Sequence, residues 1–181
     1  MTHGYGGPQL AAAFRTVRKN TVQVANDIPE DKYGFSAAPG VKTVKETLAH
    51  IALSTGFHED LHKVKRVTTL QGYDFPAVLG KWGAEEAAPR SKSEIIAMLE
   101  SRGEEFAAWL ESLSPEFLAE TYTDPTGQNP KTRLEGLLSA KEHEMHHRAQ
   151  LMLVERILGI TPHVTRAQME RLAARAAAAK G

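Results

Sequence analysis

The chain has 181 residues, of which 41% are hydrophobic and 24% are charged, values typical of one globular domain with its own core. Its formal net charge is zero and its pI is near 7.1, so no charge pattern indicates a nucleic-acid or anionic-lipid partner. It contains no cysteine, which excludes disulfides and thiolate ligands and leaves histidine and carboxylate as the strong metal ligands. The sequence shows no signal peptide and no apolar run near the roughly 18 residues of a membrane span, so we expect a cytoplasmic protein with a single domain, residues 1–181.

Two helices are predicted in the first third of the chain. Apolar residues recur at helical spacing over residues 8–27, with a proline in the first turn, where proline is favourable. Residues 28–40 contain two prolines and two glycines without a sustained period, so a connection is expected there. Thr43 and Glu46 then have the spacing of a capping box, which predicts that a second helix begins here and covers about residues 43–66.

Residues 68–90 are expected to form a long loop rather than a helix. Glycine or proline occurs at five positions in this segment, and aromatic residues lie between them. Long loops in compact domains are often functional, so we expect this segment to form the rim of a pocket. The aromatic residues of the predicted rim are Tyr73, Phe75 and Trp82.

The second half of the chain contains two further long helices and a C-terminal one. A serine cap and an apolar period predict a third helix over residues 91–113. An irregular turn or hairpin is expected over residues 122–130, the one place where strand is conceivable. The longest helix is predicted over residues 132–158 and ends at Gly159. Residues 165–180 are rich in alanine and are expected to form a fifth helix that is either a partner-facing arm or a frayed tail.

Four long helices with apolar stripes bury those stripes most simply by packing together. We therefore predict an all-α fold, an up-and-down four-helix bundle with a long connection between its second and third helices. The bundle is expected to occupy residues 8–160, with the extra C-terminal helix following it.

Three of the eight histidines lie within five residues of the fourth predicted helix. His143 and His147 are four residues apart, so both rings can lie on one helical face and reach one ion. Gly136 and Ala140 precede them on that face and are expected to leave room for an ion or a ligand. His146 is rotated by about 60° from this face and is interpreted as a surface or supporting residue. Spacing alone is equally compatible with one buried, hydrogen-bonded histidine and one exposed histidine.

A third ligand has to come from another helix, because a catalytic metal usually takes three protein ligands. On the second predicted helix, His50 lies beside the apolar stripe and points toward the interior of the bundle or its mouth. His58 is rotated by about 80° from His50, and His62 by about 120°, so both are expected toward the exposed side. These two histidines are themselves four residues apart, and a second or alternative metal site there remains an open hypothesis.

Two segments that contain these histidines resemble motifs of a known family. The first motif of the DinB family of metal-dependent enzymes is similar to residues 41–51, with the sequence VKTVKETLAHI. The second motif, H-x-x-x-H-R-x-Q, resembles residues 142–150, with the sequence EHEMHHRAQ. Ala149 stands where the family commonly has glycine, a small change that should not disturb the ligands. The likeness extends over residues 8–160 and leaves the alanine-rich segment outside it.

The resemblance implies a four-helix bundle in which three histidines bind a divalent metal, and the matching positions are His50, His143 and His147. The helical faces described above favour the same three residues. Neutral imidazoles can hold Zn²⁺, Ni²⁺ or Fe²⁺ and do not by themselves select among these metals.

The expected function is a metal-dependent transferase or hydrolase that acts on a small-molecule substrate. An ion held by neutral ligands acidifies a bound water or thiol, and the family includes enzymes that use a low-molecular-weight thiol cosubstrate. The alternative is a non-catalytic, metal-stabilised module for ligand binding or dimerisation. We expect a homodimer, with the fourth helix or the C-terminal arm at its interface.

No side chain stands out as a general base. Glu46 and Glu142 lie close in sequence to the histidines and are interpreted as supporting or surface carboxylates. Gln150, one turn beyond His147, is expected to contact a ligand or to fill a polar gap. Arg148 is expected to form a surface or interhelix salt bridge, or a subunit contact.

Overall fold

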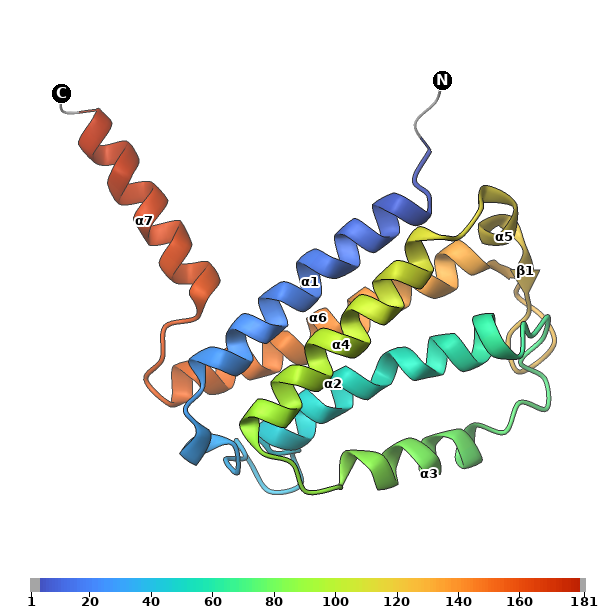
Figure 1. Cartoon of the computed structure of the whole chain (residues 1–181), viewed down its shortest axis with the longest axis horizontal. Helices are drawn as coiled ribbons and strands as arrows, with labels where there is room; N and C mark the ends of the chain where they lie inside the picture. Colours follow the sequence, from blue (N-terminus) through green and yellow to red (C-terminus); the bar gives the residue numbers. More distant parts are fainter. Residues whose placement is uncertain (1–3, 180–181) are drawn as a thin grey trace.

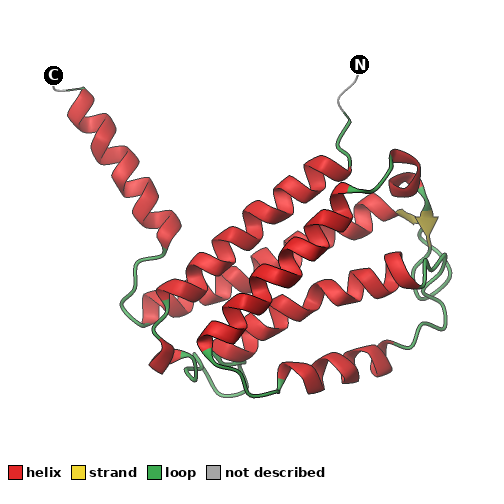
Figure 2. Ribbon diagram, in the orientation of Figure 1, coloured by secondary structure: helices red, strands yellow, loops and turns green. Residues whose placement is uncertain are grey.

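The computed structural model describes residues 4–179 of the protein, whose regular secondary structure is almost entirely helical (Figure 1, Figure 2). In chain order the helices are α1 (Gly7–Asp27), the 3-10 turn η1 (Glu30–Lys32), α2 (Val44–His58), the π-helical turn η2 (Glu59–Val64), α3 (Phe75–Glu86), α4 (Lys92–Glu111), α5 (Pro115–Ala119), α6 (Arg133–Ile157) and α7 (His163–Ala178). The strands are β1 (Thr121–Tyr122) and β2 (Lys131–Thr132), an antiparallel pair. They form the short hairpin expected before the fourth long helix.

Three of the long helices begin at a capping box, as the sequence predicts for α2. The Thr43 hydroxyl accepts a hydrogen bond from the backbone N–H of Glu46 at 3.3 Å, and the Glu46 carboxylate accepts one from the backbone N–H of Thr43 at 2.8 Å. The same arrangement begins α4 at Ser91 and α6 at Thr132. These bonds satisfy amide groups that have no partner within the helix. The carboxylate of Glu46 therefore caps α2.

Helices α1, α2, α4 and α6 form the predicted four-helix bundle (Figure 1). α1 and α2 each pack against both α4 and α6 and lie diagonally across the bundle from each other. α1 and α6 run in one direction, whereas α2 and α4 run in the other (Figure 1). The alternation expected of an up-and-down bundle thus breaks between α2 and α4, because the long connection that contains α3 carries the chain back along the length of the bundle.

The expectation of a continuous loop over residues 68–90 is wrong, since this segment contains α3. The helix begins with an Asp74 side chain that accepts a hydrogen bond from the backbone N–H of Ala77 at 2.9 Å, followed by a proline in the first turn. α3 packs along the outside of the bundle against α2, and none of its residues is fully buried. A helix that buries no complete stripe has a weak apolar period, and Gly80 and Gly83 weaken that period further.

The predicted exposure of His58 and His62 is also wrong. Only 8% of His58 and none of His62 is exposed to solvent. α2 is contacted by α3, α4 and α6, so it is covered on more sides than the sequence indicates. The π-helical turn at the end of α2 also has wider hydrogen-bond spacing, so a rotation of about 100° per residue overestimates how far His62 turns outward.

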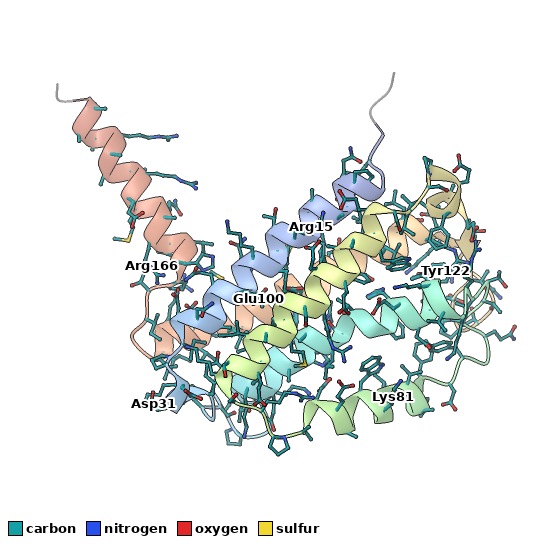
Figure 3. The ribbon with its side chains drawn as sticks, viewed as in Figure 1. Arg15, Asp31, Lys81, Glu100, Tyr122 and Arg166 are labelled. Atoms are coloured by element: carbon teal, nitrogen blue, oxygen red, sulfur yellow. The ribbon has the colours of Figure 1, made fainter. Side chains whose placement is uncertain are left out.

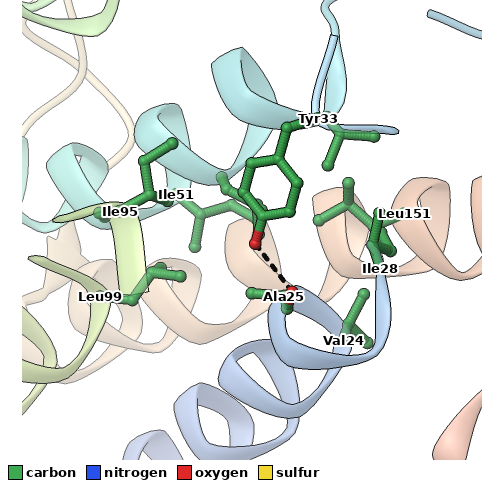
Figure 4. Packing of buried hydrophobic residues seen from close by; sticks show 11 residues of the cluster. Val24, Ala25, Ile28, Tyr33, Ile51, Ile95, Leu99 and Leu151 are labelled. Carbon is green, nitrogen blue, oxygen red and sulfur yellow. Dashed lines mark hydrogen bonds between the residues drawn. The ribbon is translucent and has the colours of Figure 1, made fainter. Parts of the chain in front are cut away.

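Two apolar clusters fill the bundle, one toward each end. In the first, the Tyr33 hydroxyl donates a hydrogen bond to the backbone oxygen of Ala25 at 2.8 Å, which ties the connection after α1 to the core (Figure 4). The buried members of this cluster are Val24, Ala25, Ile28, Tyr33, Val44, Leu48, Ile51, Ala52, Ile95, Leu99 and Leu151. Those of the second cluster are Leu10, Ala11, Phe14, Phe106, Ala107, Leu110, Leu118, Leu137 and Ala140.

A buried ion pair joins α1 to α6. On each helix it lies between the segment that contributes to the first cluster and the segment that contributes to the second. The Arg18 guanidinium is 2.9 Å from the Glu144 carboxylate, and the side chains are only 5% and 1% exposed. Arg18 also donates hydrogen bonds to the backbone oxygens of Leu99 and Ile51. The pair therefore connects α1 to all three of the other bundle helices.

α7 projects away from the bundle (Figure 1). Its first turn contains Arg166 (Figure 3). Arg166 donates a hydrogen bond to Asp27 at the end of α1 at 2.7 Å. None of its residues is fully buried, and its exposed large apolar residues are Val164, Met169 and Leu172. Across residues 4–179, no helix combines the length and apolarity needed to span a bilayer.

Candidate metal centre

Three histidines from two helices meet at one point of the bundle. α2 contributes His50, and α6 contributes His143 and His147 from successive turns. The Nε2 atom of His143 is 3.1 Å from Nε2 of His50 and 3.2 Å from Nε2 of His147. Among residues 4–179, no other group of three or more potential metal-ligating side chains comes together in this way. The structure thus brings together the three histidines predicted from the sequence.

The spacing of the three nitrogens fits a single ion. Imidazole nitrogens bound at about 2.0–2.1 Å would be about 2.9 Å apart at a right angle and about 3.4 Å apart at a tetrahedral angle. The separations of His143 from His50 and His147, 3.1 and 3.2 Å, lie between these values, and all three nitrogens lie within 4.8 Å of one another. All three side chains are only partly buried.

Two neighbouring oxygens determine which nitrogen of each outer ring carries the proton. Nδ1 of His50 donates to the Glu86 carboxylate at 2.6 Å, and Nδ1 of His147 donates to the Gln150 side-chain oxygen at 2.9 Å. With the proton on Nδ1, each ring presents the lone pair of Nε2 to the common point. A metal requires this tautomer, and oxygen acceptors of this kind commonly orient histidine ligands.

Gln150 and His146 support His147 from the outer side of α6. The Gln150 amide nitrogen is 3.2 Å from Nε2 of His146, so the amide oxygen is left to face His147. His146 is exposed, and its ring packs edge-on against that of His147 with centroids 5.0 Å apart, but it lies outside the group of three potential ligands, in agreement with its predicted supporting role. Gln150 therefore fills the polar gap behind His147.

The surroundings of His143 and His147 favour their neutral forms. Burial, reinforced by the neighbouring rings of His147 and His50, lowers the pKa of His143 to about 4. Burial also lowers the pKa of His147. Neutral imidazole is the form that binds a metal, so these rings need not lose a proton at neutral pH before binding an ion.

Glu86 is the residue of this site that the sequence does not reveal. It lies near the end of α3 and binds both His50 and Lys42, whose ammonium nitrogen is 2.5 Å from its carboxylate. Burial opposes its ionisation, but the hydrogen bonds from Lys42 and His50 outweigh burial and hold the pKa of this carboxyl below its usual range. A helical interpretation of residues 75–86 would have placed Glu86 one turn beyond Trp82, on the same face.

The other polar candidates near the histidines have different roles. Glu142 is exposed on α6, and Glu46 caps α2, so neither faces the three rings. Arg148 donates a hydrogen bond to the backbone oxygen of Val17 at 3.1 Å, which joins α6 to α1. This contact agrees with the predicted interhelix role of Arg148, although the acceptor is a backbone oxygen rather than a carboxylate.

Within residues 4–179, His58 and His62 lie apart from the group of three histidines. Their rings are nearly parallel with centroids 6.2 Å apart, and neither belongs to a group of three potential ligands in the described part of the chain. Nδ1 of His62 is 3.2 Å from the guanidinium of Arg133, which is 1% exposed. A buried cation at this distance disfavours a second positive ion.

A cavity of about 620 Å³ opens beside His50 and His143. It lies between α2, α3 and α6 and is lined by Lys42, His50, Ser54, Phe57, His58, Phe75, Leu79, Trp82, Gly83, Glu86, Ser139 and His143. Phe75 and Trp82 thus line a pocket, as predicted for the aromatic segment. Tyr73 does not reach the lining and instead donates a hydrogen bond to Asp60 at 2.7 Å.

Two glycines shape the surroundings of this cavity. The ring of Trp82 lies so close to Gly56 that a Cβ atom there would be 2.1 Å from it, so the glycine allows the ring to pack directly on the α2 backbone. Gly136 was expected to leave room for a ligand, but the Tyr122 hydroxyl fills that space, 2.4 Å from where a Cβ atom would stand. The open volume therefore lies on the α3 side of the histidines.

Two helices of the four-helix bundle bring three histidine nitrogens together beside a cavity. The fold and the site thus define the class of protein, a helical bundle with a candidate metal centre. The sequence profile of the DinB superfamily matches residues 13–151, which include all three histidines. The chain belongs to the DinB superfamily, and the resemblance found in its two motifs is confirmed.

Two solved structures from Bacillus subtilis are similar to this fold. The DinB-like protein YjoA has a TM-score of 0.62 and 22% sequence identity, and the match covers 84% of this chain and 94% of YjoA. YfiT has a TM-score of 0.64 and 17% identity, with 86% of this chain and 89% of YfiT covered. YfiT is described as a probable metal-dependent hydrolase with an unusual four-helix bundle topology. No curated protein sequence matches the chain significantly.

Proposed function

We propose that this protein is a metal-dependent enzyme in which His50, His143 and His147 bind a divalent ion, Zn²⁺, Ni²⁺ or Fe²⁺. The observation that carries the proposal is the convergence of three Nε2 atoms, with Glu86 and Gln150 orienting two of the rings. When bound by neutral imidazoles alone, such an ion would lower the pKa of a coordinated water or thiol toward neutrality.

The residues around the histidines suit a reaction between this activated nucleophile and a small molecule. The cavity of about 620 Å³ falls within the volume range of small-molecule sites and borders His50 and His143. Its wall of Phe57, Phe75 and Trp82 can hold an apolar substrate and exclude water from the reacting end. The reaction class that follows is hydrolysis or transfer to a low-molecular-weight thiol.

The description of YfiT as a probable metal-dependent hydrolase supports the hydrolytic form of this proposal. Transfer to a low-molecular-weight thiol is the other form. The chain contains no cysteine, so any thiol nucleophile must come from a cosubstrate. Screening of metal-loaded protein against esters and amides, with and without added thiols, distinguishes the two forms. Turnover that requires the thiol indicates a transferase.

Metal analysis of the purified protein tests the site itself. Replacement of His50, His143 or His147 by alanine should each abolish stoichiometric metal binding, because two imidazoles cannot replace the missing ligand. His146→Ala should retain the metal, since His146 lies outside the group of three. If any of the three ligand variants keeps the metal content of the unmodified protein, the proposed site is wrong.

We also infer that the protein is a homodimer that uses α7. A helix of 16 residues that buries none of its side chains is marginally stable by itself in water. Its exposed Met169 and Leu172, together with Leu153 and Ile157 on α6, provide apolar surface that a second copy could cover. In a symmetric pair, the same surface would serve both copies.

A further inference from the structure

The far end of the cavity contains a buried histidine that has no role in the candidate metal centre. His58 lines the cavity and is more than nine-tenths buried, with 8% of its surface exposed. Its Nδ1 atom has no hydrogen-bond partner. This nitrogen is also shielded from solvent, whereas Nε2 is not, so Nε2 is the ring nitrogen that a molecule in the cavity can reach. A buried ring that keeps one nitrogen open at a cavity wall has a hydrogen bond to offer a ligand.

His58 lies along the same face of α2 as the metal centre. His50, Ser54 and His58 follow one another at intervals of four residues, and all three line the cavity. Eight residues of helix correspond to about 12 Å along the axis. A molecule that reaches from His50 to His58 must therefore be elongated, with its two polar ends separated by about two helical turns.

The rest of the lining defines the chemistry of the molecule between these ends. Phe57 and Trp82 provide an apolar wall. The only charged lining residues are Lys42 and Glu86, which bind each other beside His50. The inner part of the cavity therefore has no counter-ion for a charged group, and a charged inner end would be poorly solvated there.

The hydroxyl groups of the lining add a preference for a hydrogen-bond donor. Ser54 donates its proton to the backbone oxygen of Ile51 at 2.9 Å, and Ser139 donates to that of Gly136 at 2.6 Å. Both can therefore only accept from a ligand. Burial, followed by the neighbouring His62 and His143, lowers the pKa of His58 to about 3, so its neutral ring also has a lone pair to offer.

We propose that the cavity binds an elongated, uncharged small molecule whose apolar body packs against Trp82 and Phe57 and whose inner end donates a hydrogen bond, as a hydroxyl or primary amide does, to His58. The inference rests on the proposed function, because the opposite end of this molecule is the one that reaches the metal centre.

Binding of three thiols with six-carbon chains to the cobalt-loaded protein tests the proposal. The probes are hexanethiol, mercaptohexanol and mercaptohexanoate, and the readout is the thiolate-to-cobalt absorption band. Unmodified protein should bind mercaptohexanol at least as tightly as hexanethiol, and mercaptohexanoate more weakly than both. His58→Phe should weaken mercaptohexanol about 10-fold or more relative to hexanethiol, because the buried hydroxyl then loses its acceptor at the inner end of the cavity. Tightest binding of mercaptohexanoate would overturn the uncharged class.

His58→Gln is the matched variant, because its side-chain amide can still accept the hydrogen bond and should retain most of the preference for mercaptohexanol. If His58→Phe weakens both thiols equally, or neither, His58 does not recognise the ligand. Calorimetric titration of the same thiols into metal-free protein separates this result from a failure of the proposed function. If the protein prefers mercaptohexanol to hexanethiol in a way that depends on His58, but the cobalt-loaded protein shows no thiolate-to-cobalt band, the pocket is supported and nucleophile activation is contradicted. If neither the metal-free nor the cobalt-loaded protein shows this preference, the pocket is overturned.

Discussion

At the level of single residues, Glu86 joins the candidate metal centre to a helix outside the bundle. Its carboxylate accepts from His50 at 2.6 Å and from Lys42, so it determines both the orientation of the ring and its tautomer. Glu85, the preceding residue, is turned away and instead binds Arg102 at 3.0 Å. These adjacent carboxylates provide a comparison between one that supports a ligand and one that does not.

Glu86→Gln should weaken metal binding by about 10- to 100-fold without abolishing it, because a carboxylate that orients a histidine ligand contributes this much in metal sites. Glu85→Gln should leave the affinity unchanged. Competition with a chromophoric chelator measures both variants. Equal affinities for Glu86→Gln and the unmodified protein would show that the contact with His50 does not support the centre.

Glu155 is a second carboxylate whose state depends on its surroundings. It is fully buried in α6, and neither side-chain oxygen has a hydrogen-bond partner. Burial, followed by the nearby charge of Asp27, raises the pKa of Glu155 from 4.5 to about 7. The folded state therefore holds this proton more tightly than the unfolded chain does, and the stability that results is complete below about pH 4.5 and is lost as the pH rises through about 7.

Glu155→Gln removes this dependence, because the amide stays neutral at every pH. Relative to the unmodified protein, the variant should gain up to about 3 kcal/mol in free energy of unfolding between about pH 5 and about pH 8. Glu100→Gln is the control, since Glu100 is exposed on α4 (Figure 3). Urea unfolding at the two pH values measures the difference, and an identical pH dependence of Glu155→Gln and the unmodified protein would contradict the assignment.

At the level of elements, the contact between α1 and α6 depends on the buried pair of Arg18 and Glu144. A charge in this position has no access to water if its partner is removed, which makes the loss of one partner more costly than the loss of both. Gly103 on α4 allows that helix to pack closely against Arg18 of α1, because a Cβ atom there would be 2.7 Å from the Arg18 side chain. An exposed pair between α1 and α4, Arg15 with Glu104, offers the contrast.

Glu144→Leu should lower the free energy of unfolding by about 3–5 kcal/mol, because it leaves Arg18 buried without a counter-ion. The double variant Arg18→Met with Glu144→Leu should recover part of this loss. Glu104→Gln should change stability little, since an exposed pair is well solvated. Urea unfolding followed by circular dichroism gives the comparison, and a double variant less stable than Glu144→Leu would show that the pair itself stabilises the fold.

At the level of the whole molecule, α7 is the element that the bundle does not use. It meets the bundle only near its first turns, through contacts such as the hydrogen bond from Arg166 to Asp27. The DinB profile ends at residue 151, so α7 also lies beyond the matched part of the chain. Its exposed Met169 and Leu172 are the natural place to test the proposed dimer.

Met169→Glu and Leu172→Glu should shift the protein from dimer to monomer, because a carboxylate on each copy would be placed in an apolar interface. Arg171→Glu, on the same exposed helix, should leave the dimer intact. Light scattering coupled to size exclusion measures the mass of each variant. A monomeric unmodified protein, or dimers that survive both glutamate substitutions, would contradict the use of α7.

Much of the fold and part of the site follow from the sequence, because their signals are local. Capping residues such as Thr43 and the apolar period along each bundle helix concern neighbours within one or two turns, so the four long helices could be predicted. His143 and His147 are likewise one turn apart on one helix. His50 required the helical face and the family motif together.

Only the tertiary structure could decide features that depend on contacts between distant segments. The direction of α4 relative to α2, the packing of α3 against α2, the hydrogen bond from His50 to Glu86 and the burial of His58 all involve such contacts. α3 buries no complete apolar stripe, so its sequence has a weak apolar period and the helix could not be predicted. The cavity beside α3 and the orienting carboxylate of Glu86 could therefore not be predicted either. The sequence by itself therefore determined which histidines face one another, whereas the packing of α3 decided what surrounds them, because a local pattern contains no information about which distant segment covers it.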